Sequence, residues 1–160
     1  MDLSDLVRTV SDVLRTKKLR LTTAESCTGG LISSLLTDLA GSSDIFDRGF
    51  VTYSNQSKMD MLGVSPLTID EYGAVSALTA AEMAKGALEH SQADLSIAVT
   101  GIAGPSGGTP EKPVGLVYIA FSRRGGETIV EENIFRGERS DVRFTTAKTA
   151  LETVLNKIGE

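Results

Sequence analysis

The chain has 160 residues, 41% of them hydrophobic and 23% charged, a length and composition typical of one globular domain. Sixteen basic and 21 acidic side chains give a net charge of −5, and the longest basic cluster spans only residues 17–20, which argues against nucleic acid as a partner. No apolar run approaches the roughly 18 residues of a membrane span, residues 1–5 contain no apolar secretion signal, and one cysteine permits no internal disulfide, so we expect a cytoplasmic protein with no membrane partner.

The first half of the chain alternates between helical and strand-like patterns. Apolar residues at helical spacing predict helices over residues 2–16, 29–39, 55–62 and 68–72. Short apolar runs predict strands over residues 19–25 and 46–52. Gly41 and Gly63 stand where two of these helices are expected to end.

In the second half, strands succeed one another. Ser76 or Thr79 starts a helix, the spacing of Thr79 and Glu82 fits a capping box, and His90 ends the helix in a structural role. Strands are expected at 95–100, 114–122 and 128–135, the last two joined by a hairpin turn at 123–126, and Ser140 caps a final helix to about residue 157. This order predicts one α/β domain over residues 1–160, a three-layer α/β/α sandwich with a mixed, mostly parallel sheet.

Three polar loops follow predicted strands, and ligands bind at the carboxyl ends of strands in open α/β sheets. The first loop, residues 25–30, reads Glu-Ser-Cys-Thr-Gly-Gly and leads into a helix. Ser26 is expected beside the free N–H groups at the start of this helix. It is either a nucleophile next to an oxyanion hole or a helix N-cap. Cys27 is a competing nucleophile because a thiol is intrinsically more reactive, but it has no obvious histidine partner.

The second loop, residues 52–58, contains Tyr53, Asn55 and Lys58. Asn55 and Lys58 share a face at the start of a helix, where the helix dipole lowers the pKa of a lysine. Lys58 is therefore a candidate general base, the alternative being a solvated surface lysine. One histidine and one cysteine cannot supply a typical zinc site, so we expect no metal.

The third loop, residues 100–113, is rich in glycine and proline. Successive backbone N–H groups in such a loop can bind an anion, although a long surface loop without function is the alternative. Farther on, Arg139 and Arg143 are four residues apart and share one side of the last helix. Paired guanidinium groups suit a phosphate or carboxylate, unless both are merely solvated charges.

Together these loops resemble the CinA C-terminal-domain family, the nicotinamide-nucleotide amidohydrolases. The matching segments cover nearly the whole chain in order: residues 23–30, 41–43, 48–55, 58, 73–76, 100–105, 112–115 and 139–143. The resemblance implies a cofactor-independent enzyme that hydrolyses the carboxamide of nicotinamide mononucleotide to nicotinic acid mononucleotide and ammonia. It implies Ser26 as nucleophile, Lys58 as general base and Tyr53 as the partner of Lys58.

The same resemblance directs attention to residues that contact the substrate. An oxyanion is expected at residues 28–30 or 100–101, the 5′-phosphate at residues 104–108 or at the two arginines, and Glu25 either orients Lys58 or binds a ribose hydroxyl. The expected substrate-binding residues are Glu25, Thr28, Gly29, Gly30, Asn55, Thr100, Gly101, Gly104, Arg139 and Arg143. Two alternatives stay open, a non-catalytic nucleotide-binding or regulatory module and an amidase for another pyridine compound. A homo-oligomer, for example a dimer, is the expected assembly.

Overall fold

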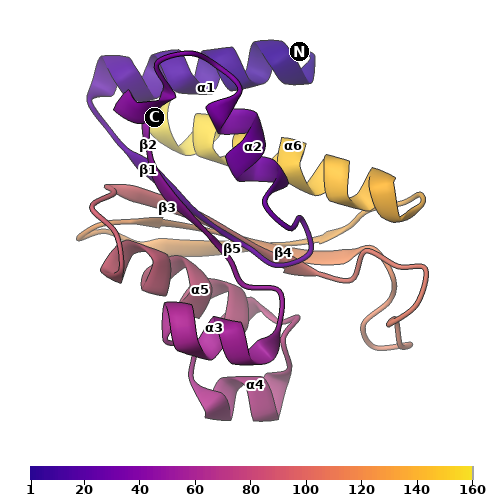
Figure 1. The fold of residues 1–160 in the computed structure, drawn as a ribbon. Coiled ribbons are helices and arrows are strands. Elements are labelled where there is room, and N and C mark those ends of the chain that lie inside the picture. The colour runs from indigo at the N-terminus through magenta and orange to yellow at the C-terminus, as the bar shows by residue number, and fades with distance from the viewer. Residues whose placement is uncertain (160) are drawn as a thin grey trace.

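A computed structural model describes residues 1–159, which form a sheet between two layers of helices (Figure 1). Helices α1 (Leu3–Lys17), α2 (Leu31–Thr37) and α6 (Arg139–Ile158) cover one face of the sheet, and a short 3₁₀ helix, η1 (Ser42–Asp44), follows α2. Helices α3 (Asn55–Leu62), α4 (Pro66–Tyr72) and α5 (Ala77–Glu89) lie on the other face. The predicted three-layer α/β/α architecture is confirmed.

The sheet has five strands in the order β2-β1-β3-β4-β5. Their bounds are β1 (Leu21–Glu25), β2 (Phe46–Val51), β3 (Leu95–Gly101), β4 (Leu116–Arg123) and β5 (Thr128–Ile134). Strand β1 pairs in parallel with β2 and β3, whereas β4 is antiparallel to both of its neighbours. Only β4 therefore runs against the common direction, as expected for a mixed, mostly parallel sheet. The carboxyl ends of β2, β1 and β3 consequently meet at one edge.

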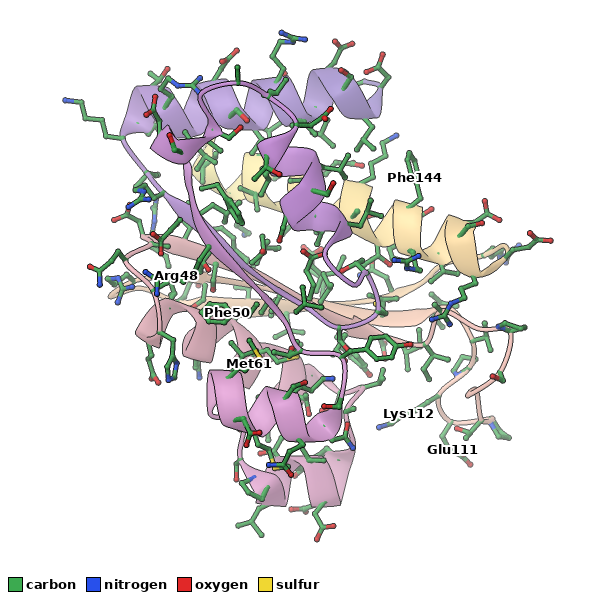
Figure 2. The ribbon with its side chains drawn as sticks, viewed as in Figure 1. Arg48, Phe50, Met61, Glu111, Lys112 and Phe144 are labelled. Atoms are coloured by element: carbon green, nitrogen blue, oxygen red, sulfur yellow. The ribbon has the colours of Figure 1, made fainter. Side chains whose placement is uncertain are left out.

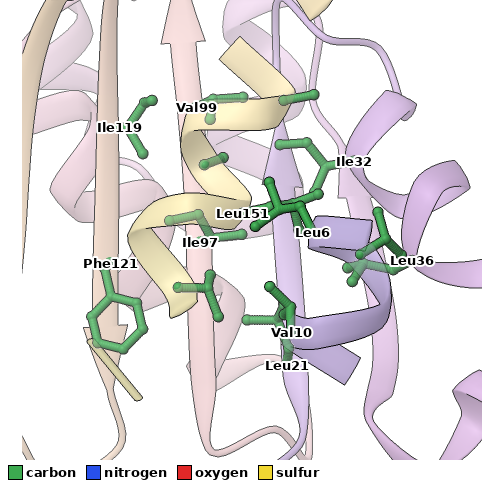
Figure 3. Close-up of a cluster of buried hydrophobic side chains, with 14 of the residues drawn as sticks. Leu6, Val10, Leu21, Ile32, Leu36, Ile97, Val99, Ile119, Phe121 and Leu151 are labelled. Carbon is green, nitrogen blue, oxygen red and sulfur yellow. The ribbon is translucent and has the colours of Figure 1, made fainter. Parts of the chain in front are cut away.

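Side chains alternate between the two faces of the central strands, so each face has its own core. Ile97 and Val99 of β3 pack among aliphatic side chains of α1, α2 and α6 (Figure 3). Ala98, between them in sequence, faces α5, as do Ala24 of β1 and Ala120 of β4. Alanines on this face let α5 approach the sheet closely, and α3 packs in turn on α5.

The contact between α3 and α5 is close because Gly86 has no side chain. A Cβ at Gly86 would lie 2.7 Å from the carbonyl carbon of Leu62, at the end of α3. The backbone of α3 is thereby held directly against α5. This contact fixes the position of α3, and therefore of Lys58, relative to the carboxyl ends of the strands.

The predicted helix over residues 29–39 is shorter than expected. Gly29 and Gly30 have φ angles of 60° and 105°, outside the right-handed helical region, so α2 begins at Leu31. It ends at Thr37. Strand β1 likewise begins at Leu21, two residues after the predicted start, and β4 begins at Leu116 rather than at residue 114.

Helix α5 begins at Ala77, and its N-cap is Ser76, one of the two predicted starts. The Ser76 hydroxyl accepts a hydrogen bond from the Thr79 N–H, as expected for an N-cap. The predicted capping box of Thr79 and Glu82 is wrong, because the Glu82 carboxylate instead accepts from the Ser65 N–H at 2.8 Å and from the Thr68 hydroxyl at 2.6 Å. Glu82 thus ties α5 to the start of α4.

The predicted cap of the last helix is also wrong. Ser140 lies inside α6, whose N-cap is Glu138, with Asp141 accepting from the Glu138 N–H at 2.8 Å. Lys112 of the long loop donates to the carbonyl of Tyr72 and so fastens the loop to α4 (Figure 2). Within residues 1–159, no helix has the length and apolar character needed to cross a bilayer.

Candidate active site

A cavity of about 360 Å³ opens where β1, β2 and β3 end, a volume within the usual range for small-molecule sites. Seven of the thirteen predicted site residues line it: Ser26, Tyr53, Lys58, Thr100, Gly101, Gly104 and Arg139. Six do not: Glu25, Thr28, Gly29, Gly30, Asn55 and Arg143. The three predicted loops therefore do converge, but only part of each faces the cavity.

Ser26 and Lys58 are in direct contact at the bottom of this cavity. The Lys58 ammonium donates to Ser26 Oγ at 2.9 Å, to the Thr52 carbonyl at 2.9 Å and to the Tyr53 carbonyl at 3.3 Å. These three acceptors use all three protons of the ammonium. When Lys58 is neutral, the two carbonyls retain its two protons, and its lone pair points at Ser26 Oγ. The geometry suits transfer of the serine proton to the amine.

The Lys58 side chain is 1% exposed, so the alternative of a solvated surface lysine is wrong. Burial lowers the pKa of its amine to about 8. The predicted direction of the shift is confirmed, but the first cause is desolvation rather than the helix dipole. The side chain reaches inward because Ser54 and Ser57 cap α3 reciprocally and fix the turn before Lys58.

Cys27 lies next to Ser26 and also lines the cavity, but the Lys58 ammonium donates to Ser26 Oγ and not to the Cys27 sulfur. Its side chain is 5% exposed and packs in the core between the sheet, α2 and α6. Burial raises the pKa of the Cys27 thiol to about 11, which disfavours the reactive thiolate. Of the two candidate nucleophiles, only Ser26 is hydrogen-bonded to a base.

Tyr53 contributes to the site in two ways. Its carbonyl accepts from Lys58, whereas the residue as a whole is 63% exposed and its hydroxyl accepts from Arg139 Nη2 at 3.1 Å. Arg139 Nη1 also donates to the Gly104 carbonyl at 2.8 Å. Arg139 therefore joins the start of α6, the glycine-rich loop and Tyr53 at the mouth of the cavity.

Glu25 and Arg143 do not reach the cavity, although both contact the turn that carries Ser26. The buried Glu25 carboxylate binds groups of Thr28 and of the first turn of α2. Arg143 donates to the carbonyls of Cys27 and Thr28. Asn55 is exposed on the first turn of α3.

The glycine-rich loop presents unused hydrogen-bond donors. The N–H groups of Ala103, Gly104, Ser106 and Gly107, all of which line the cavity, donate to no backbone carbonyl of residues 1–159. The N–H of Cys27 is likewise without a backbone carbonyl partner in that range. Such donors suit an oxyanion or a phosphate.

Several lining residues were not singled out by the sequence analysis. Ala74 and Val75 complete one wall, and the Thr100 hydroxyl donates to the Ala74 carbonyl at 2.7 Å. Residues 73–76 did belong to the segments that carry the family resemblance, which was the available signal. Ser106 and Gly107, by contrast, belong to residues 104–108, which the sequence analysis gave as one of two expected positions of the 5′-phosphate.

His90 ends α5, and its ring Nδ1 lies 2.8 Å from the Gly86 carbonyl, away from the cavity lining. In the described part of the chain, no three His, Cys, Asp or Glu side chains gather as metal ligands would.

Comparison with known proteins places this site in context. A family model described as the CinA C-terminal domain matches residues 3–158. The nicotinamide-nucleotide amidohydrolase PncC of Escherichia coli K12 is 46% identical over 153 residues, or 96% of this chain and 93% of that protein. PncC of Enterobacter agglomerans is 47% identical over 155 residues, or 97% and 94%.

Longer proteins and solved structures also match. A CinA-like protein of Akkermansia muciniphila is 49% identical over 143 residues, which make up 89% of this chain but 34% of that protein. The crystal structure of the competence/damage inducible protein CihA of Agrobacterium tumefaciens has a TM-score of 0.96 and 48% identity, covering 100% of this chain and 97% of that one. The fold is therefore shared with CihA, and each of these proteins aligns with most of this chain.

Proposed function

Because the chain belongs to the CinA C-terminal domain family, we propose that it is a nicotinamide-nucleotide amidohydrolase that converts nicotinamide mononucleotide to nicotinic acid mononucleotide and ammonia. The substrate class comes from the names of the PncC relatives, which share 46% and 47% of their aligned residues with it. The observation that carries the chemistry is the 2.9 Å contact between Lys58 Nζ and Ser26 Oγ.

In the first half of the reaction, neutral Lys58 takes the proton of Ser26 as Oγ attacks the carboxamide carbon. The carbonyl oxygen becomes an oxyanion. When the tetrahedral intermediate collapses, the C–N bond breaks and Lys58 returns the proton to the leaving nitrogen, which departs as ammonia. An ester between Ser26 and the nicotinoyl group remains.

In the second half, water replaces the amine. Lys58, neutral again, takes a proton from water as the water oxygen attacks the ester carbon. Collapse breaks the bond to Ser26 Oγ, which recovers the proton from Lys58, and nicotinic acid mononucleotide is released. Lys58 contacts Ser26 directly, so the proton needs no relay through the Tyr53 hydroxyl.

The unused N–H groups suggest where the negative charges are held. We assign the oxyanion to the N–H of Cys27, which directly follows the nucleophile and has no backbone carbonyl partner in the described residues. We assign the 5′-phosphate to Arg139 and the N–H groups of Ser106 and Gly107, which also line the cavity. Glu25, Asn55 and Arg143 lie outside the cavity lining and receive no substrate contact in this proposal.

The deciding experiment measures ammonia release from nicotinamide mononucleotide in the presence of a chelator. The wild-type chain, Ser26→Ala, Lys58→Ala and, as a control at an exposed lysine, Lys18→Ala are compared. We expect turnover by the wild type and by Lys18→Ala and none above background in the other two. Nucleotide binding without turnover would favour the non-catalytic module, and turnover of other pyridine amides alone would favour a different substrate. The homo-oligomeric assembly and the cytoplasmic location stay predictions.

A further inference from the structure

The turn formed by residues 25–28, here called the nucleophile turn, is held from two sides by charged side chains that do not line the cavity. We propose that Glu25 and Arg143 are positioning residues, which fix the nucleophile turn so that Ser26 Oγ stays in line with Lys58, and that neither binds the substrate. The inference rests on the proposed function of Ser26 as nucleophile.

Glu25 holds the turn from the side of α2. Its carboxylate is fully buried and accepts four hydrogen bonds, from Thr28 Oγ1 at 2.6 Å, the Ile32 N–H at 2.8 Å, the Ser33 N–H at 3.0 Å and Ser33 Oγ at 2.7 Å. A carboxylate has about four acceptor positions, and all are used here. Glu25 therefore has no acceptor left for a ribose hydroxyl or for Lys58.

Arg143 holds the turn from the side of α6. Its Nε donates to the Cys27 carbonyl at 3.1 Å and its Nη2 to the Thr28 carbonyl at 3.0 Å. The rigid guanidinium fork spans two consecutive carbonyls, which a single ammonium cannot do with the same geometry. These contacts direct the guanidinium to the backbone of the nucleophile turn, whereas Arg139, one helical turn earlier, faces the cavity.

Ser26 lies between these two attachments. Its N–H donates to the Val99 carbonyl at 3.1 Å, and its own carbonyl accepts from the Gly29 N–H at 3.1 Å. With β3 before it and the clamped backbone after it, Ser26 has little freedom to move its Oγ away from Lys58. Losing one attachment lets the turn shift, and misplacement of a reacting atom by about 1 Å can lower a rate up to roughly 100-fold.

The two interpretations of Arg143 predict different kinetics. A positioning residue changes the reactivity of Ser26 towards any electrophile, so Arg143→Lys lowers kcat with little change in KM. A phosphate ligand changes the affinity for the nucleotide, so the same variant raises KM and leaves the reactivity of Ser26 intact.

The test combines turnover of nicotinamide mononucleotide with labelling of Ser26 by a small fluorophosphonate, followed by mass spectrometry. For Arg143→Lys and Glu25→Gln we expect kcat to fall about 10- to 100-fold, labelling to slow by a similar factor, and KM to change less than about twofold. Ser33→Ala keeps the Glu25 carboxylate and removes one of its hydrogen bonds. If Glu25→Gln does not fold, Ser33→Ala replaces it in the test, and we expect a smaller decrease in kcat and in the labelling rate.

Arg124→Lys is the matched control. Arg124 also donates to backbone carbonyls, those of Leu88, Ser91 and Ala93, but it lies beside the start of β3, at the opposite end of the sheet. We expect this variant to label at the wild-type rate, even if its melting temperature falls.

Labelling at the wild-type rate in both Arg143→Lys and Glu25→Gln, or a rise in KM without a change in labelling, would overturn the proposal. Failure of the wild type to label at Ser26 would also overturn it. Because labelling needs no nucleotide, slower labelling in the variants supports the clamp even if the wild type does not hydrolyse nicotinamide mononucleotide. That result would refute only the proposed substrate.

Discussion

The buried lysine makes the pH dependence of the reaction a quantitative test. If Lys58 must be neutral to accept the Ser26 proton, kcat/KM follows the neutral fraction of its amine in the free enzyme. Burial lowers the pKa of Lys58 to about 8. At pH 7, a pKa of about 8 leaves ~9% of the amine neutral, compared with ~0.03% for an ordinary lysine at 10.5.

These fractions give two different profiles. With a pKa of about 8, kcat/KM rises about tenfold between pH 7 and 9 and levels off above pH 9. With an unshifted amine, it rises about 100-fold over the same interval and continues to rise. The substrate phosphate does not interfere, because its second ionisation, near pH 6, is essentially complete in this range.

The assay is ammonia release at low substrate concentration in buffers of constant ionic strength from pH 6.5 to 10. Lys58→Arg is the control variant, since a guanidinium stays protonated throughout and cannot accept the proton. We expect no measurable activity from it at any pH. A flat wild-type profile, or a rise without a plateau up to pH 10, would refute the role assigned to Lys58.

The same pKa difference affects stability, which gives an independent check. The folded state binds fewer protons at Lys58 than the unfolded state does between pH 8 and 10.5, so this group makes the protein more stable as the pH rises through that interval. The full effect is about 3 kcal/mol. We expect chemical denaturation at pH 7.5 and 10 to show a smaller gain in the free energy of unfolding for Lys58→Met than for the wild type. An equal gain in both proteins would contradict the lowered pKa.

Three further predictions concern other residues. Cys27 should resist iodoacetamide in the folded protein and react after unfolding, because its thiol is buried with a pKa of about 11; rapid native labelling with loss of activity would reopen its candidacy as nucleophile. Arg139→Gln should raise KM for nicotinamide mononucleotide by roughly tenfold or more through a lost charge-assisted contact, and an unchanged KM would place the phosphate elsewhere. Gly49→Ala should destabilise the fold by about 1–3 kcal/mol in denaturant titrations, since its Cβ would lie 2.8 Å from Thr23 Oγ1 and closer still to Ser33 Oγ. Wild-type stability in this variant would mean that these two side chains can move aside at no cost.

Much of the fold follows from local pattern in the chain. The helical and strand periods, and the alternation that ends in a hairpin, predicted a three-layer α/β sandwich, and the structure confirms it. Local pattern was less informative about the ends of elements. Ser140 and Thr79 have good capping chemistry, yet Glu138 and Ser76 cap the helices, because several nearby polar residues compete and packing selects among them.

The sequence alone also determined which loops form the candidate site. Ser26, Tyr53 and Lys58 follow predicted strands, and the carboxyl ends of parallel strands meet at one edge. A strand order with β1 between β2 and β3 brings Ser26 and Lys58 together across 32 residues of sequence. Composition and loop pattern could not give that distance, because it depends on how α3 packs against α5.

Only the tertiary structure decided the direction in which each side chain points. Glu25, Ser26 and Cys27 are consecutive, but the Glu25 carboxylate binds Ser33 of α2, Cys27 packs in the core, and only Ser26 is hydrogen-bonded to Lys58. Arg139 and Arg143 share a side of one helix, yet the first lines the cavity and the second binds backbone carbonyls. Both outcomes depend on the register of strands and helices that are distant in the sequence, and residue spacing alone contains no information about that register.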